Sequence, residues 1–168
     1  MKHLVFSLTV FCLLASTVSC DKQQIKYVDL ESIYRQNIQD SVLATGWYHI
    51  VDDENGFKRQ LDKSEIFYFI DPNPILVKEH FDKIKIYKTN FRRWYQYDIG
   101  LSFQVYKDYY DLWADATEKS IGKKIGLIID NKLVTAPTVQ CKISEGRSSL
   151  QRPDYDEKDL ETFKKLLK

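Results

Sequence analysis

The chain has 168 residues, of which 43% are hydrophobic and 29% are charged. A chain of this length can bury roughly two-thirds of its unfolded surface in one ordinary domain, so folding needs no disulfide framework. The formal net charge of +1 argues against the strongly basic face that is typical of nucleic-acid-binding domains. We therefore expect no nucleic-acid partner.

Residues 1–19 have the layout of a secretory signal peptide. A basic start precedes an uncharged run from Leu4 to Ser19, which is shorter than the about 20 residues that a membrane-spanning helix needs. The segment resembles a bacterial lipoprotein signal, in which cleavage between Ser19 and Cys20 leaves the cysteine to carry acyl chains. Thr17 departs from the aliphatic residue that is usual at its position. The alternative is an ordinary signal peptide that is cleaved nearby.

A lipidated Cys20 implies a location in the bacterial cell envelope, with the domain in the periplasm or at the cell surface. Each buried methylene of an acyl chain contributes about 0.8 kcal/mol to membrane binding, so several chains anchor a protein stably. Cys12 leaves with the signal peptide, so Cys141 has no intramolecular partner for a disulfide. Its apolar neighbours favour a buried structural thiol, and a nucleophilic or redox thiol is the alternative.

We expect residues 20–43 to form a tether with a possible short helix, and residues 44–168 to form the folded domain. Residues 45–52 are typical of a strand, and the Asn-Gly pair within 53–56 favours a tight turn. A second strand is expected over 65–70, where the following Asp-Pro-Asn-Pro sequence should end it.

Strict alternation over residues 83–88 predicts a strand with Ile84 and Ile86 on one face. The basic and aromatic segment 91–97 follows it. Trp, Tyr and Arg dominate interface hot spots, so this segment is a candidate hairpin tip or protein-contact surface. Packing of its aromatic side chains over the sheet is an equally good interpretation, and base stacking is a weak one. The proposed contacts are Arg92, Arg93 and Trp94.

A further strand is expected where Leu101, Phe103 and Val105 alternate with polar residues. From Asp108 the pattern changes to that of a helix, which Gly122 ends. The apolar stripe of this helix is expected to contain Tyr109, Leu112, Trp113 and Ala116.

Residues 124–130 are apolar at nearly every position, as in a strand that is covered on both faces. Asn131 and Lys132 are expected to make a turn, and residues 133–141 to lead away extended, with Pro137 at an edge or bulge. The last helix carries acids first and lysines last, as the helix dipole prefers, with Leu160, Phe163, Leu166 and Leu167 on one face. These elements predict an α+β fold, with a mostly antiparallel sheet packed against about two helices.

The C-terminal part of the chain also contains a set of residues in a characteristic order and spacing, namely Thr117, Gly122, Lys123, Asp130, Lys132, Ala136, Pro137, Ile143, Gly146 and Arg147. With this set, residues 101–167 resemble the head subdomain of the first periplasmic domain of the SecD and SecDF protein-export family, here in a stand-alone lipoprotein. The resemblance extends more weakly upstream, over residues 67–86 and 45–52.

The resemblance implies the soluble fold of that family and no proton-driven motor, because the family's pore-facing charges lie in transmembrane helices that this chain lacks. The matching residues are interpreted as structural before they are interpreted as ligand contacts. Gly122 and Gly146 suit turns, Asp130 is able to bond backbone amides at a strand end, and Pro137 ends a ladder. Arg147, a charged loop residue, is the best candidate for exposure.

No pattern indicates chemistry. Without the signal peptide, His49 and His80 are the remaining histidines, with no paired histidines and no cysteine cluster, so we expect no metal and no cofactor. The chain has no Gly-x-Ser-x-Gly motif and no phosphate-binding glycine loop. We therefore do not expect an enzyme.

These patterns predict a non-catalytic, membrane-anchored lipoprotein that binds protein or peptide and is linked to protein export or envelope maintenance. Strand addition at an edge between Lys132 and Thr138 is one hypothetical mechanism. An inhibitor or immunity-type lipoprotein with one defined partner is the first alternative, and a small hydrolase that uses Cys141 with a histidine is the second. Besides residues 92–94, the candidate binding surface comprises Val134, Pro137 and Arg147.

Overall fold

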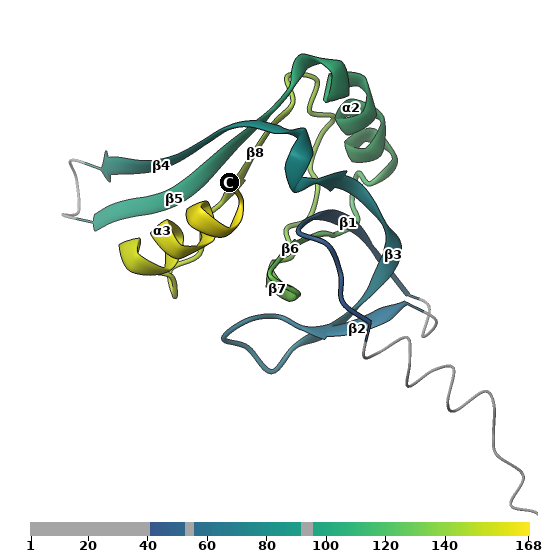
Figure 1. Cartoon of the computed structure of the whole chain (residues 1–168), viewed down its shortest axis with the longest axis horizontal. Coiled ribbons are helices and arrows are strands. Elements are labelled where there is room, and N and C mark those ends of the chain that lie inside the picture. The colour runs from purple at the N-terminus through teal and green to yellow at the C-terminus, as the bar shows by residue number, and fades with distance from the viewer. Residues whose placement is uncertain (1–40, 53–55, 92–95) are drawn as a thin grey trace, which may run out of the picture.

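The computed structural model describes residues 41–52, 56–91 and 96–168, and its elements form two sheets and two α-helices (Figure 1). Short 3-10 turns lie at Lys78–His80 and Lys107–Tyr109. The strands and helices are β1 (Gly46–Val51), β2 (Phe57–Gln60), β3 (Phe67–Val77), β4 (Phe81–Phe91), β5 (Gln96–Val105), α2 (Tyr110–Lys119), β6 (Ile125–Ile129), β7 (Lys132–Thr135), β8 (Arg147–Leu150) and α3 (Glu157–Leu166).

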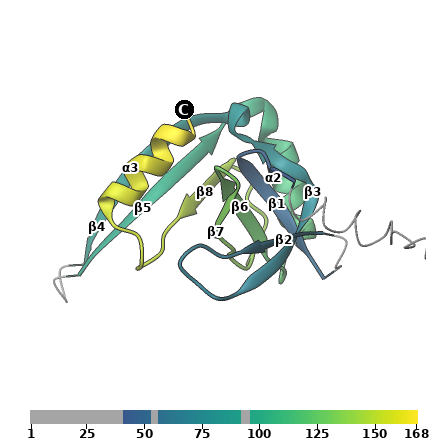
Figure 2. The same cartoon turned by 60° about the horizontal axis from the view of Figure 1, so that its bottom comes forward.

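The larger sheet has five antiparallel strands in the order β2-β3-β1-β6-β7, and it curls on itself (Figure 2). The chain beyond β2 reaches β7 through a parallel bridge between Leu61 and Leu133. The Asp62 backbone N–H donates to the Leu133 carbonyl at 2.8 Å. We call residues 61–66, which make this closure and lead into β3, the strap. The five strands form the curled sheet.

The curled sheet has its own hydrophobic core. This core collects side chains from strands of the curled sheet and from the chain just before β1. Its fully or nearly fully buried members are Leu43, Tyr48, Ile70, Ile128 and Leu133. Leu43 is 4% exposed, so this core includes a residue just before the expected domain boundary at residue 44.

The prediction that two prolines end a strand near residue 70 is wrong. β3 continues from Phe67 to Val77, and Pro74 pairs with Tyr48 of β1. Register shifts on both sides of Tyr48 mark bulges in this ladder. A bulge leaves an extra residue unpaired, so a proline without an N–H is tolerated there.

The smaller sheet has three antiparallel strands in the order β4-β5-β8. Leu101, Phe103 and Val105 of β5 are at most 2% exposed, which confirms the predicted buried face. Ile84 and Ile86 of β4 pack against the same core, as their alternation predicts. β4 and β5 pair through Phe91 and Gln96 at their far ends. Residues 92–95, and with them Arg92, Arg93 and Trp94, lie outside the described residues.

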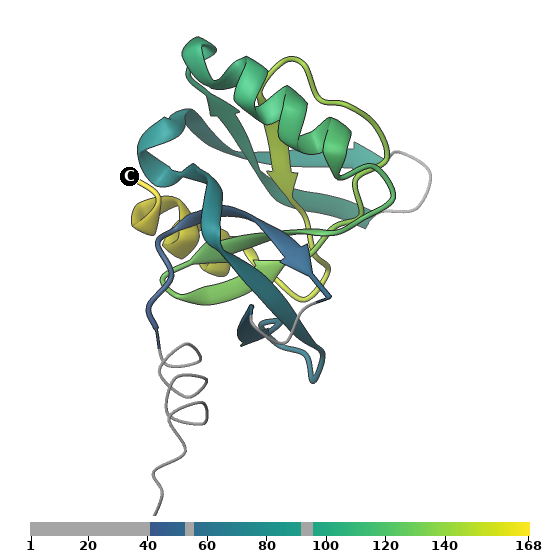
Figure 3. The ribbon, with the colours of Figure 1, turned by 90° about the vertical axis from the view of Figure 1, so that its right-hand side faces the viewer.

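The main core lies between the two sheets and under the helices (Figure 3). Trp47 of β1, Phe103 of β5 and Trp113 of α2 meet at its centre. α3 packs on the smaller sheet, against β4 and β5. The core therefore joins the two sheets into one unit.

Each predicted helical stripe is correct except at one leucine. Leu112 of α2 is 46% exposed and Leu166 of α3 is 41% exposed. α2 buries Trp113, Ala114, Ala116 and Thr117. Its buried face is therefore rotated away from Leu112, toward Ala114 and Thr117, relative to the predicted stripe. The acidic first turn and basic last turn of α3 are confirmed, and the Asp156 carboxylate accepts the Asp159 N–H at its N-terminus.

The hairpin between β6 and β7 turns one residue earlier than predicted. Asp130 and Asn131 have φ of 50° and 61°, the pair of positive values that a type I′ turn requires, and Lys132 belongs to β7. All five residues of β6 are buried, as its apolar sequence predicts. The α+β class, with antiparallel sheets and two helices, is confirmed.

Candidate functional site

A groove of about 1010 Å³ lies between the smaller sheet and the segment of residues 137–143, which follows β7. We call this space the groove. It is lined from β1, β4, β5, α2, β6 and β8 as well as from that segment. Its volume lies at the upper end of the about 300–1,000 Å³ that is typical of ligand sites.

The floor of the groove is aromatic. Trp47 lies 5.6 Å from Trp113 and 6.4 Å from Phe103 between ring centroids. Trp113 Nε1 donates a hydrogen bond to the Arg147 carbonyl at 3.2 Å, which ties α2 to the start of β8. Trp47 is 1% exposed, and its Nε1 has no hydrogen-bond partner among the described residues. Trp113 and Phe103 are also at most 2% exposed, so the three rings form a rigid, buried support beneath the groove and are not themselves a contact surface.

The rim of the groove is basic. Lys83 and Lys85 of β4 and Arg147 of β8 line it together with one acid, Asp82. Lys83 lies 3.6 Å from Asp82, and Arg147 lies 3.3 Å from Glu145. Lys85 has no carboxylate partner among the described residues. These groups are exposed, so each pair stabilises the fold only slightly, and the cationic excess remains available to a ligand.

The far wall of the groove is held by hydrogen bonds to the curled sheet and to α2. The Pro137 carbonyl accepts the Ile125 N–H at 3.1 Å, and the Val139 N–H donates to the Lys123 carbonyl at 2.9 Å. The Ile143 N–H donates to Thr117 Oγ1 at 3.0 Å. These bonds already use much of the wall's backbone, so the wall bounds the groove instead of pairing with a ligand.

Val134 does not belong to any binding surface, which corrects the prediction of strand addition between Lys132 and Thr138. The Val134 side chain is 0% exposed. Its carbonyl accepts hydrogen bonds from Arg152 Nη1 at 2.9 Å and Tyr155 Oη at 3.1 Å. The Leu133 carbonyl accepts a hydrogen bond from the Asp62 N–H of the strap. The edge of β7 is therefore closed.

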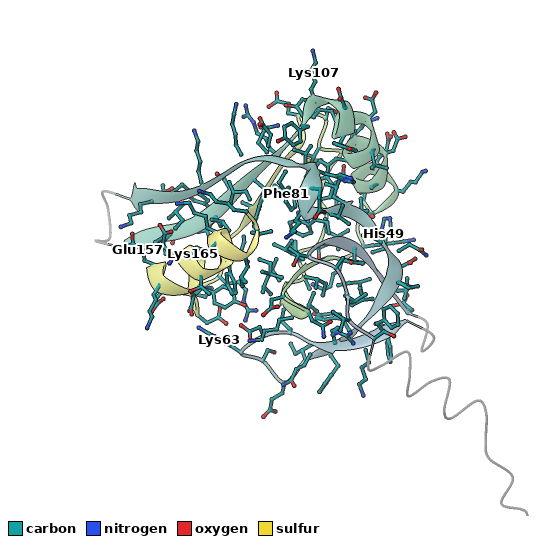
Figure 4. All side chains as sticks on the ribbon, in the orientation of Figure 1. His49, Lys63, Phe81, Lys107, Glu157 and Lys165 are labelled. Atoms are coloured by element: carbon teal, nitrogen blue, oxygen red, sulfur yellow. The ribbon has the colours of Figure 1, made fainter. Side chains whose placement is uncertain are left out.

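A charged cluster holds this closure in place beneath α3. Tyr155 Oη lies 3.0 Å from Asp62 Oδ2, and burial together with this carboxylate raises the pKa of Tyr155. Lys63 of the strap donates to Asp159 of α3 at 2.6 Å, and this hydrogen bond lowers the pKa of Asp159 (Figure 4). Arg152 lies over the Tyr155 ring at 4.9 Å. The sequence carried no signal that these distant residues would meet.

Two of the predicted surface residues do line the groove. Pro137 is exposed in the far wall, and the Arg147 side chain is 72% exposed at the rim. Ser19 and Cys20, the predicted cleavage and lipid-attachment residues, lie outside the described residues.

The prediction of a buried Cys141 is wrong. The thiol is exposed and lines the groove. Val139, two residues earlier, is 6% exposed, packs in the main core and forms a parallel bridge with Ile121. Strand geometry ends after that bridge, so apolar neighbours in the sequence do not bury Cys141.

Backbone conformation explains the two glycines on which the resemblance to SecD partly rests. Gly122 and Gly146 have φ of 78° and 62°, a region that favours glycine. A Cβ on Gly146 would also lie 2.5 Å from the Tyr110 ring. Asp130 occupies a turn with positive φ, and its N–H donates to Thr45 Oγ1 at 3.1 Å. Among the described residues the Asp130 carboxylate accepts no hydrogen bond, contrary to the expected role. Lys123 and Ala136 flank the wall of the groove.

Among the described residues, the groove lining does not bring together side chains of the kind that act in catalysis or bind metal ions. Within residues 41–52, 56–91 and 96–168, no group of three His, Cys, Asp or Glu residues could hold a metal ion. His49 and His80 are absent from the groove lining, so neither accompanies Cys141 there. His49 instead lies beside Ser120, with Nδ1 3.2 Å from Oγ, and burial lowers its pKa (Figure 4). Ser120 is 2% exposed, as expected of a buried residue at the end of α2.

No helix in the described part of the chain is long and apolar enough to cross a membrane. No protein-family model matches the chain. A search of curated proteins also finds no match.

Solved structures of SecDF resemble this chain. A crystal structure of SecDF in a super-membrane-facing form matches with a TM-score of 0.56 and 11% identity, over 83% of this chain and 20% of that chain. A structure of SecDF, described as a membrane component that enhances protein export, matches with a TM-score of 0.56 and 10% identity, over 83% of this chain and 68% of that chain. The chain therefore spans about a fifth of the first structure's length. The described domain has a SecDF-like fold, as the sequence resemblance implied.

Proposed function

We propose that this protein is a non-catalytic envelope lipoprotein that binds polypeptides in the groove. Its ligands are exported or unfolded envelope proteins. The groove carries this proposal, since it combines a cationic rim with accessible apolar lining at Pro137 and Ile143, beside a sheet and over a buried aromatic layer. Such a surface suits an extended chain better than it suits a small reactive substrate.

The SecDF-like fold supports the link to export. One matching structure is that of a protein described as enhancing protein export. Fold alone does not carry function, so the proposal depends on the groove and uses the fold to choose among polypeptide ligands.

The N-terminal sequence supports attachment to a membrane. In this proposal, acyl chains on Cys20 hold the protein at the envelope, and residues 21–43 link the anchor to the domain. Mass spectrometry of the intact protein should find acylation at Cys20, and a Cys20→Ser variant should be released from membranes.

Photo-cross-linking in intact cells tests the binding function. A photoreactive residue replaces Gln140, which is exposed in the groove, and a matched control replaces Lys158, which is exposed on α3 outside the groove. The proposal expects many unrelated secreted chains to be captured from position 140 and few from position 158. Capture of one stoichiometric protein would instead assign the groove to an inhibitor or adapter. Equal capture from both positions would contradict groove binding.

A further inference from the structure

The edge of β8 is the feature of the groove that the proposed function leaves unassigned. β8 is the last strand of the smaller sheet, with β5 on one side and the groove on the other. Arg147, Ser148 and Ser149 all line the groove, and Ser149 is exposed. An edge strand normally offers unpaired backbone groups to another chain.

The ladder register shows which backbone groups of β8 are unpaired. The Val105 N–H donates to the Gly146 carbonyl at 3.0 Å, and β5 and β8 continue from there in regular antiparallel register. Hydrogen-bonded and non-hydrogen-bonded pairs alternate in such a ladder. Ser148 therefore bonds to β5, whereas Arg147 and Ser149 direct their N–H and C=O groups away from it. The Arg147 carbonyl meets Trp113 Nε1, which agrees with this alternation.

The Ser149 backbone has no such partner within the described part of the chain. Its N–H and C=O point away from β5, and no hydrogen bond joins either group to another described residue. The closed edge of β7 differs, since the strap, Arg152 and Tyr155 occupy its carbonyls. The exposed edge strand β4 differs again, because it carries Lys83, Lys85 and Lys88, and lysines discourage edge pairing. Ser148 and Ser149 provide no comparable protection.

The two sides of the β8 edge differ in chemistry. Directly paired residues share a face, so Arg147 and Ser149 lie on the face of Gln104 and Ser102, and β4 continues that face with Lys83 and Lys85. The opposite face carries the buried Phe103 and Leu150, and the accessible apolar lining of the groove comes from Pro137 and Ile143. A strand beside β8 would therefore meet cations with one set of side chains and apolar groups with the other.

We propose that the free edge of β8 binds an extended segment of the protein ligand as a fourth strand of the smaller sheet, and that this segment alternates acidic and apolar residues. Backbone bonds to Ser149 supply affinity for many chains, and the side-chain alternation supplies selectivity. Lys83 and Arg147 already have carboxylate partners, so the positive charge that selects the acidic set comes chiefly from Lys85, which has none among the described residues. This inference rests on the proposed function, because it names the mode and class of ligand for the same groove.

Binding of synthetic peptides to the full chain tests the mode. The probe is a fluorescein-labelled peptide of alternating Glu and Val, and the matched probe replaces each Glu by Lys. Fluorescence anisotropy should find the Glu peptide bound at least about tenfold more tightly than the Lys peptide. Equal affinity of the two peptides would overturn the acidic preference.

Backbone pairing is tested on both partners. Ser149→Pro removes the N–H that faces the groove and should weaken the Glu peptide about tenfold or more, whereas Ser149→Ala keeps the N–H and should bind as the wild type does. A second measurement changes the peptide and leaves the protein unchanged. One peptide is N-methylated at its Glu residues and another at its Val residues. Because alternate amides of an added strand point toward β8, methylation of one set should abolish binding and methylation of the other should be tolerated. Equal effects of both sets would overturn strand addition.

Failure of this inference is distinguishable from failure of the proposed function. Secreted chains cross-linked at position 140, together with unchanged binding to Ser149→Pro, would retain groove binding and remove the β8 mode. Absence of cross-linking would remove both. A concentration-dependent dimer that Ser149→Pro abolishes, without peptide binding, would assign the edge to a second copy and overturn the inference.

Discussion

β7 and β8 are both four-residue strands at the end of a sheet, yet the structure treats their edges in opposite ways. Leu133 and Val134 of β7 are 0% exposed, and the strap and two side chains occupy their carbonyls. Ser149 of β8 is exposed beside the groove. An edge strand is therefore available for binding only where no distant segment of the same chain covers it.

The partners that close β7 come from elsewhere in the sequence. Asp62 lies in the strap after β2, and Arg152 and Tyr155 lie between β8 and α3. β8 is covered at Arg147, where Trp113 of α2 bonds its carbonyl, and is left open at Ser149. The difference between the two edges thus depends on tertiary contacts and not on strand propensity.

The largest expected effect comes from introducing proline into each edge. Val134→Pro should unfold the protein or cost more than about 4 kcal/mol, because it disrupts a fully buried position. Ser149→Pro should cost less than about 1 kcal/mol, because an edge strand tolerates proline where its N–H has no partner. Urea denaturation of both variants measures the difference. Similar losses of stability in both would contradict the contrast between the edges.

Removal of the two side chains that close β7 should have a moderate effect. Tyr155→Phe and Arg152→Ala each remove one hydrogen bond to the Val134 carbonyl and should cost about 1–2 kcal/mol. The double variant should lose more than the sum, since it leaves a buried carbonyl unsatisfied, with a coupling of about 0.5–3 kcal/mol. A double-mutant cycle from urea denaturation measures this coupling, and simple additivity would show that the two side chains close the edge independently.

Acidification should have a smaller effect, through His49 beside α2. Burial lowers the folded-state pKa of His49, and Lys123 and Lys119 act in the same direction while Asp71 opposes them. The unfolded state therefore binds more protons, and stability should fall as pH decreases from about 6.5 toward the lower folded-state pKa. A His49→Asn variant cannot gain this proton, so its stability should fall less over the same range. Identical pH profiles of the two proteins would contradict this role.

The smallest expected effect on stability comes from Cys141. Its thiol is exposed in the groove, so iodoacetamide should modify it in the native protein while the unfolding midpoint in urea stays nearly constant. Bound Glu-Val peptide should slow this modification if it occupies the groove. The Lys142→Ala variant changes an exposed neighbour outside the groove lining. It serves as the control for changes in thiol reactivity that come from a nearby substitution and not from the peptide. Modification only after denaturation would contradict the exposed thiol.

Local patterns predicted much of the fold. The apolar run of β6, the alternation of β5 and the polar gradient of α3 each depend on neighbouring residues, and each is confirmed. The α+β class and the SecDF-like fold follow from the order of these elements. Such features are visible in a sequence because burial repeats with the period of the helix or strand.

The site could be predicted only in part, because it depends on long-range contacts. Arg147 and Pro137 were placed on the surface correctly. The prediction fails at Val134 because the strap, Arg152 and Tyr155 cover that residue, and at Cys141 because strand geometry ends before it. Ser149 was missed, since a Ser-Ser pair in a short strand carries no sequence signal of an open edge.

Residue-resolved amide hydrogen exchange, with and without the Glu-Val peptide, tests the central claim most directly. In the free protein the Ser149 amide should exchange much faster than that of Ser148, which bonds to β5, and the amides of β7 should keep the same protection in both states. Peptide should slow exchange at Ser149. A Ser149 amide that is already as protected as Ser148, or that does not respond to bound peptide, would contradict an open edge at β8.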